Sequence, residues 1–210
     1  MIRGLREILP DNGKAFSSIL ISLKTRNFRL YFTGMCVSLT GTWMQQIAMS
    51  WLVYRLTGSV FLLATVTFMA QIPILLVTPL MSVFVDRFDR QKILILTQSL
   101  SMVQALSMAV LTLSGVIEVW HILILSLLIG CINALDNPTR QAFYPSLVAK
   151  EHLSNAIALN SAVINGSRLI GPAVGGVLIG IFGEGLCFLL NGISYLGVII
   201  ALFLMRLSPF

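Results

Sequence analysis

The chain has 210 residues, of which 57% are hydrophobic and only 10% are charged, and its formal net charge is +6. A soluble domain carries about 25% charged residues, so the composition excludes an ordinary soluble protein. The basic residues form no patch with interleaved aromatic residues, which excludes a nucleic-acid-binding domain. Because a helix needs roughly 20 apolar residues to cross the hydrocarbon layer, the chain is predicted to lie in a lipid bilayer.

Six transmembrane helices are predicted from the apolar runs and the polar breaks between them, which makes the fold class an all-α membrane protein. A cytoplasmic N-terminal segment, residues 1–27, precedes the bundle at residues 28–206, and a cytoplasmic end, residues 207–210, follows it. The expected spans are residues 28–54, 60–85, 92–114, 119–137, 157–182 and 186–206. Between the fourth and fifth spans, residues 140–153 form either a short helix at the membrane surface or an ordered loop.

Lysine and arginine are distributed unequally between the two sides of this bundle. Twelve of them fall on the side of the termini, Arg55 alone falls on the other side, and Arg168 lies inside the fifth span. Cytoplasmic loops carry the excess of Lys and Arg in membrane proteins. Both termini are therefore expected in the cytoplasm.

The turn between the second and third spans, FVDRFDRQK at residues 84–92, concentrates charges in an otherwise apolar region. Basic residues alone would be enough to hold the orientation of the helices. The turn also carries two carboxylates, which indicates a further role. Its charged residues of interest are Asp86, Arg87, Asp89 and Arg90.

Amide side chains lie at mid-membrane depth in the first span, where Gln45 and Gln46 follow Trp43. Amides at this depth need hydrogen-bond partners. They either bridge helices or line a substrate path in which Trp43 is a stacking surface. Asn165 in the fifth span leaves the same two alternatives open.

Arg168 is a charge inside the fifth span, where an unpaired ion costs several kcal/mol. It must face a partner or a water-filled cavity. Asp136, at the cytoplasmic end of the fourth span, is the nearest acidic candidate by depth. The two residues form either an ion pair that joins the spans or part of a substrate or proton site.

Small residues interrupt the fifth span soon after Arg168. Gly171, Pro172, Gly175 and Gly176 remove side chains and one backbone donor, so the helix can bend and a neighbour can approach closely. The alternative is helix packing alone.

Signatures of enzyme chemistry are absent from the sequence. It contains no GxxxxGK[ST] phosphate loop and no GxSxG nucleophile elbow. His121 and His152 are expected on opposite sides of the membrane, so metal-ligand spacing is absent too. We expect no enzyme, no cofactor, no metal site and no nucleic-acid partner.

The turn at residues 84–92 resembles the loop between spans two and three of the major facilitator superfamily, G-x-x-x-D-R-x-G-R-R. Asp86, Arg87 and Arg90 match it, whereas Ser82 and Asp89 replace its glycines. The D-R-F-D-R form is similar to bacterial exporters such as the enterobactin exporter and macrolide efflux pumps. Further similarities are G-T-W-M-Q at 41–45, W-L-V-Y-x-L-T-G-S at 51–59, N-P-T-R-Q-A-F at 137–143 and G-P-x-x-G-G at 171–176.

The resemblance implies the N-terminal six-helix half of a twelve-helix fold that exposes a central substrate to each side in turn. It implies a multi-pass exporter of the bacterial inner membrane, which moves an amphipathic siderophore-like or drug-like molecule, with proton antiport. Candidate cavity residues are Trp43, Gln46, Asn165 and Arg168, and the charged turn is the expected cytoplasmic gate.

The partner of the gate in this family is a second six-helix half. Six spans account for one half of the family's fold, and two explanations for the other half are open. The favoured one is that the chain is a fragment of a longer reading frame, and the other is that two copies pair as a homodimer. The competing function is a degenerate half-carrier without transport activity that acts at most as an interaction partner in the membrane.

Overall fold

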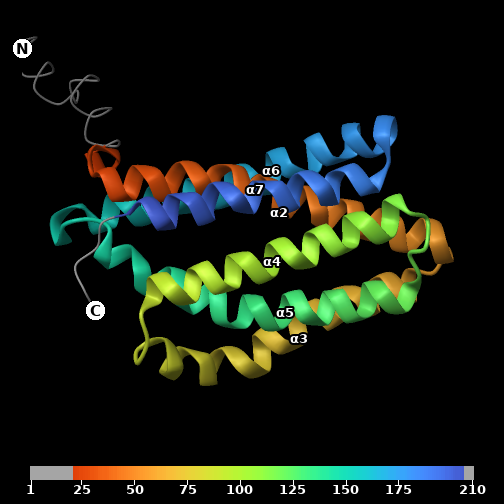
Figure 1. The fold of residues 1–210 in the computed structure, drawn as a ribbon, viewed down its shortest axis with the longest axis horizontal. Helices are drawn as coiled ribbons and strands as arrows, with labels where there is room; N and C mark the ends of the chain where they lie inside the picture. Colours follow the sequence, from red (N-terminus) through yellow and green to blue (C-terminus); the bar gives the residue numbers. More distant parts are fainter. Residues whose placement is uncertain (1–20, 206–210) are drawn as a thin grey trace, which may run out of the picture.

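The computed structural model describes residues 21–205, and within this range the chain folds into six long α-helices (Figure 1). The expected end at residues 207–210 and most of the expected N-terminal segment lie outside the described residues. The elements are η1 (Ile21–Lys24), α2 (Arg26–Thr57), α3 (Val60–Val85), α4 (Arg90–Leu113), α5 (Val119–Phe143), η2 (Tyr144–Ser146), η3 (Lys150–His152), α6 (Leu153–Phe182) and α7 (Glu184–Leu204).

The six helices run back and forth along one long axis, and helices distant in sequence become neighbours. Contacts are most extensive between α3 and α5, α2 and α7, α4 and α7, and α2 and α6. In Figure 1, α2, α6 and α7 form one side of the bundle and α3, α4 and α5 form the other. The start of α2 and the α3–α4 and α5–α6 connections share one end, which we call the basic end because Lys24, Arg87, Lys92 and Lys150 lie there.

Five of the helices, α3 to α7, are long and apolar enough to cross a membrane. The remaining helix, α2, has 32 residues and is free of charge from residue 30 to residue 54, but it carries Thr40, Thr42, Gln45 and Gln46. These polar residues lower its mean hydropathy. The prediction of an all-α membrane protein with six long helices is confirmed, and five of the six are long and apolar enough to span.

Glycines allow two pairs of helices to approach backbone to backbone. A Cβ atom on Gly34 of α2 would lie 3.0 Å from the carbonyl oxygen of Gly197 in α7. A Cβ atom on Gly130 of α5 would lie 2.5 Å from the carbonyl oxygen of Ala70 in α3. Small residues at such positions are what membrane helices use in place of a hydrophobic driving force.

An ion pair joins α2 to α7 at the end opposite the basic end. Arg55 Nε donates to Glu184 Oε1 at 2.7 Å, and Arg55 Nη2 donates to Glu184 Oε2 at 3.2 Å. Glu184 is only 5% exposed, so this two-bonded geometry offsets the cost of its burial. The single cation expected at this end therefore has a structural partner.

The fourth predicted span corresponds to α5, which runs past its expected end at residue 137 and continues through Pro138 to Phe143. Phe143 is buried against Tyr31 of α2 with their ring centroids 5.5 Å apart, and this contact holds the last turn. The following segment is neither an isolated helix nor a long loop. It consists of the 3₁₀ turns η2 and η3, and α6 begins at Leu153, ahead of the expected residue 157.

Candidate functional site

A cavity of about 430 Å³ opens between α2, α5 and α6, in the part of the bundle nearest the basic end. Trp43 and Gln46 line it, as expected, whereas Asn165 and Arg168 are not among its lining residues. The wall combines aromatic, amide and charged groups inside otherwise apolar helices. Its polar and aromatic members are Thr42, Trp43, Gln45, Gln46, Ser101, Asn133, Asp136, Asn137, Arg140, Gln141, Tyr144, Asn160 and Tyr195.

A second cavity of about 110 Å³ continues from the first toward α3. The two share Thr42, Gln45, Gln46 and Asn133 in their walls. The second one adds polar groups from the middle of α3, including Gln71. A polar surface thus extends from the basic end toward the centre of the bundle.

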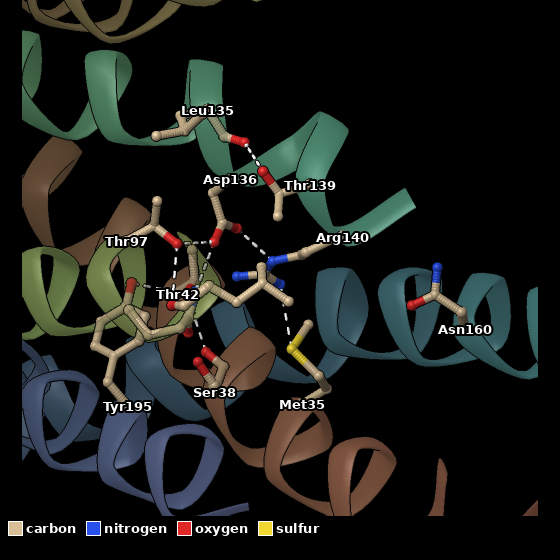
Figure 2. Close-up of polar contacts among 12 residues, drawn as sticks. Met35, Ser38, Thr42, Thr97, Leu135, Asp136, Thr139, Arg140, Asn160 and Tyr195 are labelled. Atoms are coloured by element: carbon tan, nitrogen blue, oxygen red, sulfur yellow. Dashed lines mark hydrogen bonds and ion pairs between the residues drawn. The ribbon is translucent and has the colours of Figure 1, made fainter. Parts of the chain in front are cut away.

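A buried ion pair forms one wall of the larger cavity (Figure 2). The Asp136 carboxylate is 2% exposed and pairs with Arg140, four residues further along α5. Its Oδ1 atom also accepts hydrogen bonds from Thr97 Oγ1 at 2.6 Å and Gln98 Nε2 at 2.9 Å. Arg140 reaches across to α2, where its Nη1 atom lies 3.3 Å from Met35 Sδ.

This geometry corrects one expectation, because the charge partner of Asp136 is Arg140 and not Arg168. Residues at positions i and i+4 of a helix lie on the same face. Arg140 therefore reaches the carboxylate without any contact between spans. The depth argument overlooked it because Arg140 was expected in the connection after the fourth span and not inside the helix.

Arg168 instead lies over the ring of Trp43, with its guanidinium carbon 4.8 Å from the ring centroid. Close packing of α6 on α2 brings the two together, since a Cβ atom on Gly171 would lie 2.6 Å from Trp43 Cβ. Arg168 is thus an exposed cation in contact with an aromatic side chain that lines the cavity. Asn165 is exposed on the same helix and donates to the Ser161 carbonyl oxygen at 2.9 Å.

The glycine and proline residues of α6 divide into two groups. Gly171 and Gly175 face α2, where added Cβ atoms would lie within 3.4 Å of its atoms, whereas Gly176 has no atom within 4 Å of such a Cβ. The helix continues through Pro172 from Leu153 to Phe182. The packing alternative accounts for Gly171 and Gly175, and helix bending stays a prediction.

The neighbouring amides of α2 serve two different purposes. Gln45 is buried, donates to Gln104 Oε1 at 3.1 Å and accepts from Asn191 Nδ2 at 2.8 Å. Gln104 in turn donates to the Leu125 carbonyl oxygen at 3.2 Å, so the network joins α2, α4, α5 and α7. Gln46 is exposed on the cavity wall. Gln45 is therefore a helix bridge, and Gln46 is free to contact a solute.

The two carboxylates of the charged turn between α3 and α4 make different contacts. Asp89 caps α4, because its Oδ1 atom accepts from the Gln91 backbone nitrogen at 2.9 Å. The Asp86 side chain is 75% exposed, and Arg90 approaches it only to 3.6 Å. Arg87 is exposed as well. Asp86 is thus the carboxylate of this turn with oxygen atoms open to a further partner.

Several residues of the site escaped sequence reasoning. Arg140, Thr97 and Gln98 surround Asp136, and only the spacing of Arg140 gave a signal in the sequence. Thr97 and Gln98 come from α4, so only packing brings them to α5. Within residues 21–205, no group of three or more His, Cys, Asp or Glu side chains is placed to hold a metal ion.

Comparison with known proteins identifies the family. Residues 17–208 match the family model described as "Transmembrane secretion effector". The staphyloferrin A transporter of Staphylococcus aureus is 31% identical over 168 residues, which are 80% of this chain and 42% of that protein. Macrolide efflux protein A of Streptococcus pyogenes is 28% identical over 162 residues, which are 74% of this chain and 39% of that protein.

A third relative, the uncharacterized MFS-type transporter YfiS of Bacillus subtilis, is 27% identical over 81% of this chain and 40% of its own length. The chain thus spans less than half the length of these curated relatives, which are transporters and not enzymes. No solved structure matches the chain. The resemblance inferred from the charged turn is confirmed, and the chain belongs to the transmembrane secretion effector family of the major facilitator superfamily.

Proposed function

We propose that the chain is the N-terminal half of a secondary transporter that exports an amphipathic small molecule from the cytoplasm by proton antiport. The observation that carries this proposal is the cavity of about 430 Å³, which places Trp43, Gln46 and a charged pair inside a membrane bundle. This volume falls in the range of roughly 300–1,000 Å³ that is typical of small-molecule sites. The names of the relatives support a siderophore or a macrolide as the kind of molecule exported.

The proposed location is the bacterial inner membrane, with both termini and the basic end in the cytoplasm. The excess of Lys and Arg at the basic end supports this orientation. Asp136 is the proposed proton site, because it is the carboxylate in the wall of the cavity. Once it takes a proton, Asp136 would release Arg140.

A second six-helix half is the proposed partner, either encoded further along the same reading frame or supplied by a second copy. Polar side chains are exposed within the spans, either in the walls of the two cavities or, for Asn165 and Arg168, on α6 beside them, and lipid cannot satisfy their hydrogen-bonding groups. A second half that packs over these side chains would leave a shared, water-filled site. The exposed polar residues are Gln46, Gln71, Asn137, Gln141, Asn165 and Arg168.

Efflux measurements test the transport proposal. The chain is expressed in an efflux-deficient bacterium, by itself and within its complete reading frame, and retention of erythromycin and of staphyloferrin A is measured. We expect export of at least one of them, and a protonophore should stop it. Trp43→Ala should lower the rate, whereas Trp51→Phe, a change at an exposed aromatic residue outside the cavity, should not.

If neither compound is exported, and proton flux is the same with and without the protein, the degenerate half-carrier becomes the better description. Export that persists when the proton gradient is dissipated would contradict proton antiport and would leave the proposal of export standing.

The gate role is proposed for Asp86 in particular, with Arg87 and Arg90 beside it, because Asp89 is engaged as a helix cap. We expect Asp86→Asn to lower the rate of efflux about tenfold or more, a loss comparable to that of one charge-assisted hydrogen bond. Asp89→Asn should retain efflux, since asparagine caps helices as well as aspartate does. Initial efflux rates at equal expression check both results. Equal losses in the two variants would contradict the separation of roles.

A further inference from the structure

Positively charged side chains outnumber negatively charged ones in and beside the cavity, and this excess affects which molecules the cavity can hold. Asp136 and Arg140 line it, and Arg168 lies outside its wall over the ring of Trp43, which does line it. Among residues 21–205, Asp136 and Arg140 are the ionised side chains of the cavity wall, and Arg168 is a further cation in contact with that wall. Together they comprise one anion and two cations.

The single carboxylate is already occupied. Asp136 Oδ1 accepts from Thr97 and Gln98, and Asp136 Oδ2 pairs with Arg140. A cationic solute would have to break this buried ion pair to find a counter-charge. Removing one partner of a buried pair leaves an uncompensated charge, which is strongly unfavourable.

The arginines, by contrast, have donors to spare. A guanidinium group carries several N–H donors in a fixed fork. The contacts of Arg140 are the ion pair with Asp136 and the approach of Nη1 to Met35 Sδ, and a thioether sulfur is a weak acceptor. An oxygen anion in the cavity would be a stronger partner for that edge of Arg140.

Arg168 has no carboxylate within ion-pair distance among the described residues, and its contact is the face of Trp43. Stacking on an aromatic ring uses the face of the guanidinium and leaves its edge donors available. An arginine within a span faces a partner or a water-filled cavity, and an anion is the strongest partner available to it. The geometry places such an anion beside Trp43, where an apolar or aromatic body could also stack.

We propose that the cavity selects a molecule that carries a carboxylate, which binds the edge of Arg140 that faces Met35, leaves the pair with Asp136 intact, and is attracted by Arg168. This proposal rests on the proposed transport function and names the chemical class of its substrate. It assigns to Arg140 and Arg168 the role of specificity-determining residues. It also predicts that a permanently cationic molecule of the same size binds poorly.

Two xanthene dyes of opposite charge test the preference. The purified chain is placed in nanodiscs of phosphatidylcholine, and fluorescence polarisation measures binding of fluorescein, a dianion, and rhodamine 6G, a cation. Empty nanodiscs give the background from partition into lipid. We expect the dissociation constant of fluorescein to be at least about tenfold lower, as one additional charge-assisted hydrogen bond requires.

Variants identify the groups responsible. Arg168→Gln, and separately the double variant Asp136→Asn with Arg140→Gln, should each weaken fluorescein binding about tenfold. Asp136→Asn alone should strengthen it, because Arg140 then lacks its internal anion. Lys92→Gln is the matched control, since it removes one positive charge from an exposed position outside the cavity and should change nothing.

The possible contrary results are distinguishable. Binding of rhodamine 6G as tight as that of fluorescein, lowered by Trp43→Ala, would overturn the carboxylate preference and leave the transport proposal standing. Fluorescein binding that is unchanged in Arg168→Gln would overturn the assignment of Arg168 and point to a carboxylate of the second half as its partner. Failure of both dyes to bind would overturn the inference that these residues of the chain hold the carboxylate, whereas the transport proposal is tested separately by the efflux measurements.

Discussion

Arg140→Gln is expected to lower the free energy of unfolding by about 3–5 kcal/mol, the usual cost of breaking a buried ion pair from one side. The variant leaves Asp136 2% exposed, with Thr97 and Gln98 as its remaining donors. It also removes the contact between α5 and Met35 of α2. Unfolding of the detergent-solubilised chain in increasing concentrations of sodium dodecyl sulfate, followed by circular dichroism, measures the change.

The double variant Asp136→Asn with Arg140→Gln is the control for this result. It removes both charges and keeps side chains of similar size, so no uncompensated ion remains. Replacing a whole buried pair is often close to neutral. We therefore expect the double variant to recover most of the lost stability, and a double variant as unstable as the single one would contradict a stabilising role for the ion pair.

Gly171→Ala is expected to destabilise the chain by about 1–3 kcal/mol, the typical cost of adding a methyl group to a fully packed contact. The new Cβ atom would lie 2.6 Å from Trp43 Cβ and 2.8 Å from the Thr40 carbonyl oxygen. Neither atom is the end of a flexible side chain, so α2 and α6 must move apart. Because that contact also sets the position of Arg168 over Trp43, fluorescein binding should fall with stability.

Gly176→Ala on the same helix gives the opposite expectation. No atom lies within 4 Å of the added Cβ. Alanine is favoured over glycine in the interior of a helix by roughly 0.5–1 kcal/mol. The same unfolding measurement should show no loss of stability for this variant. Similar losses for the two alanine variants would mean that the α2–α6 contact is not as close as the structure shows.

The helical elements were predictable because their cause is local. Charge-free runs such as residues 56–85 are long enough to span hydrocarbon, and the Thr57-Gly58-Ser59 break produced the expected turn, in which Gly58 has a φ of 60°. The end of α5 was not predictable by the same reasoning. The fourth span was expected to end at residue 137, but the packing of Phe143 on Tyr31 extends the helix beyond it.

The candidate site was only partly predictable. Trp43 and Gln46 were expected in the cavity and line it. The expectation was possible because an amide at mid-membrane depth is costly without a hydrogen-bond partner, and Trp43 lies close to it in the sequence. The prediction that Asp136 is the partner of Arg168 was wrong, because the depth of a residue in the membrane does not say which face of its helix the residue occupies. Gln45 and Gln46 also show that the face of a helix matters as much as depth. They are adjacent in α2, but Gln45 is buried against Gln104, whereas Gln46 is exposed.

Six membrane helices and the family of the charged turn could be predicted from single segments, because the length of a charge-free run and a short local motif do not depend on the rest of the fold. The contacts of the site could not be predicted in this way, because packing between helices creates them. The tertiary structure placed Thr97 and Gln98 of α4 against Asp136 of α5, and it set Arg168 of α6 on Trp43 of α2. These contacts depend on which helices pack together and how they are rotated, and such rotations arise from the whole bundle.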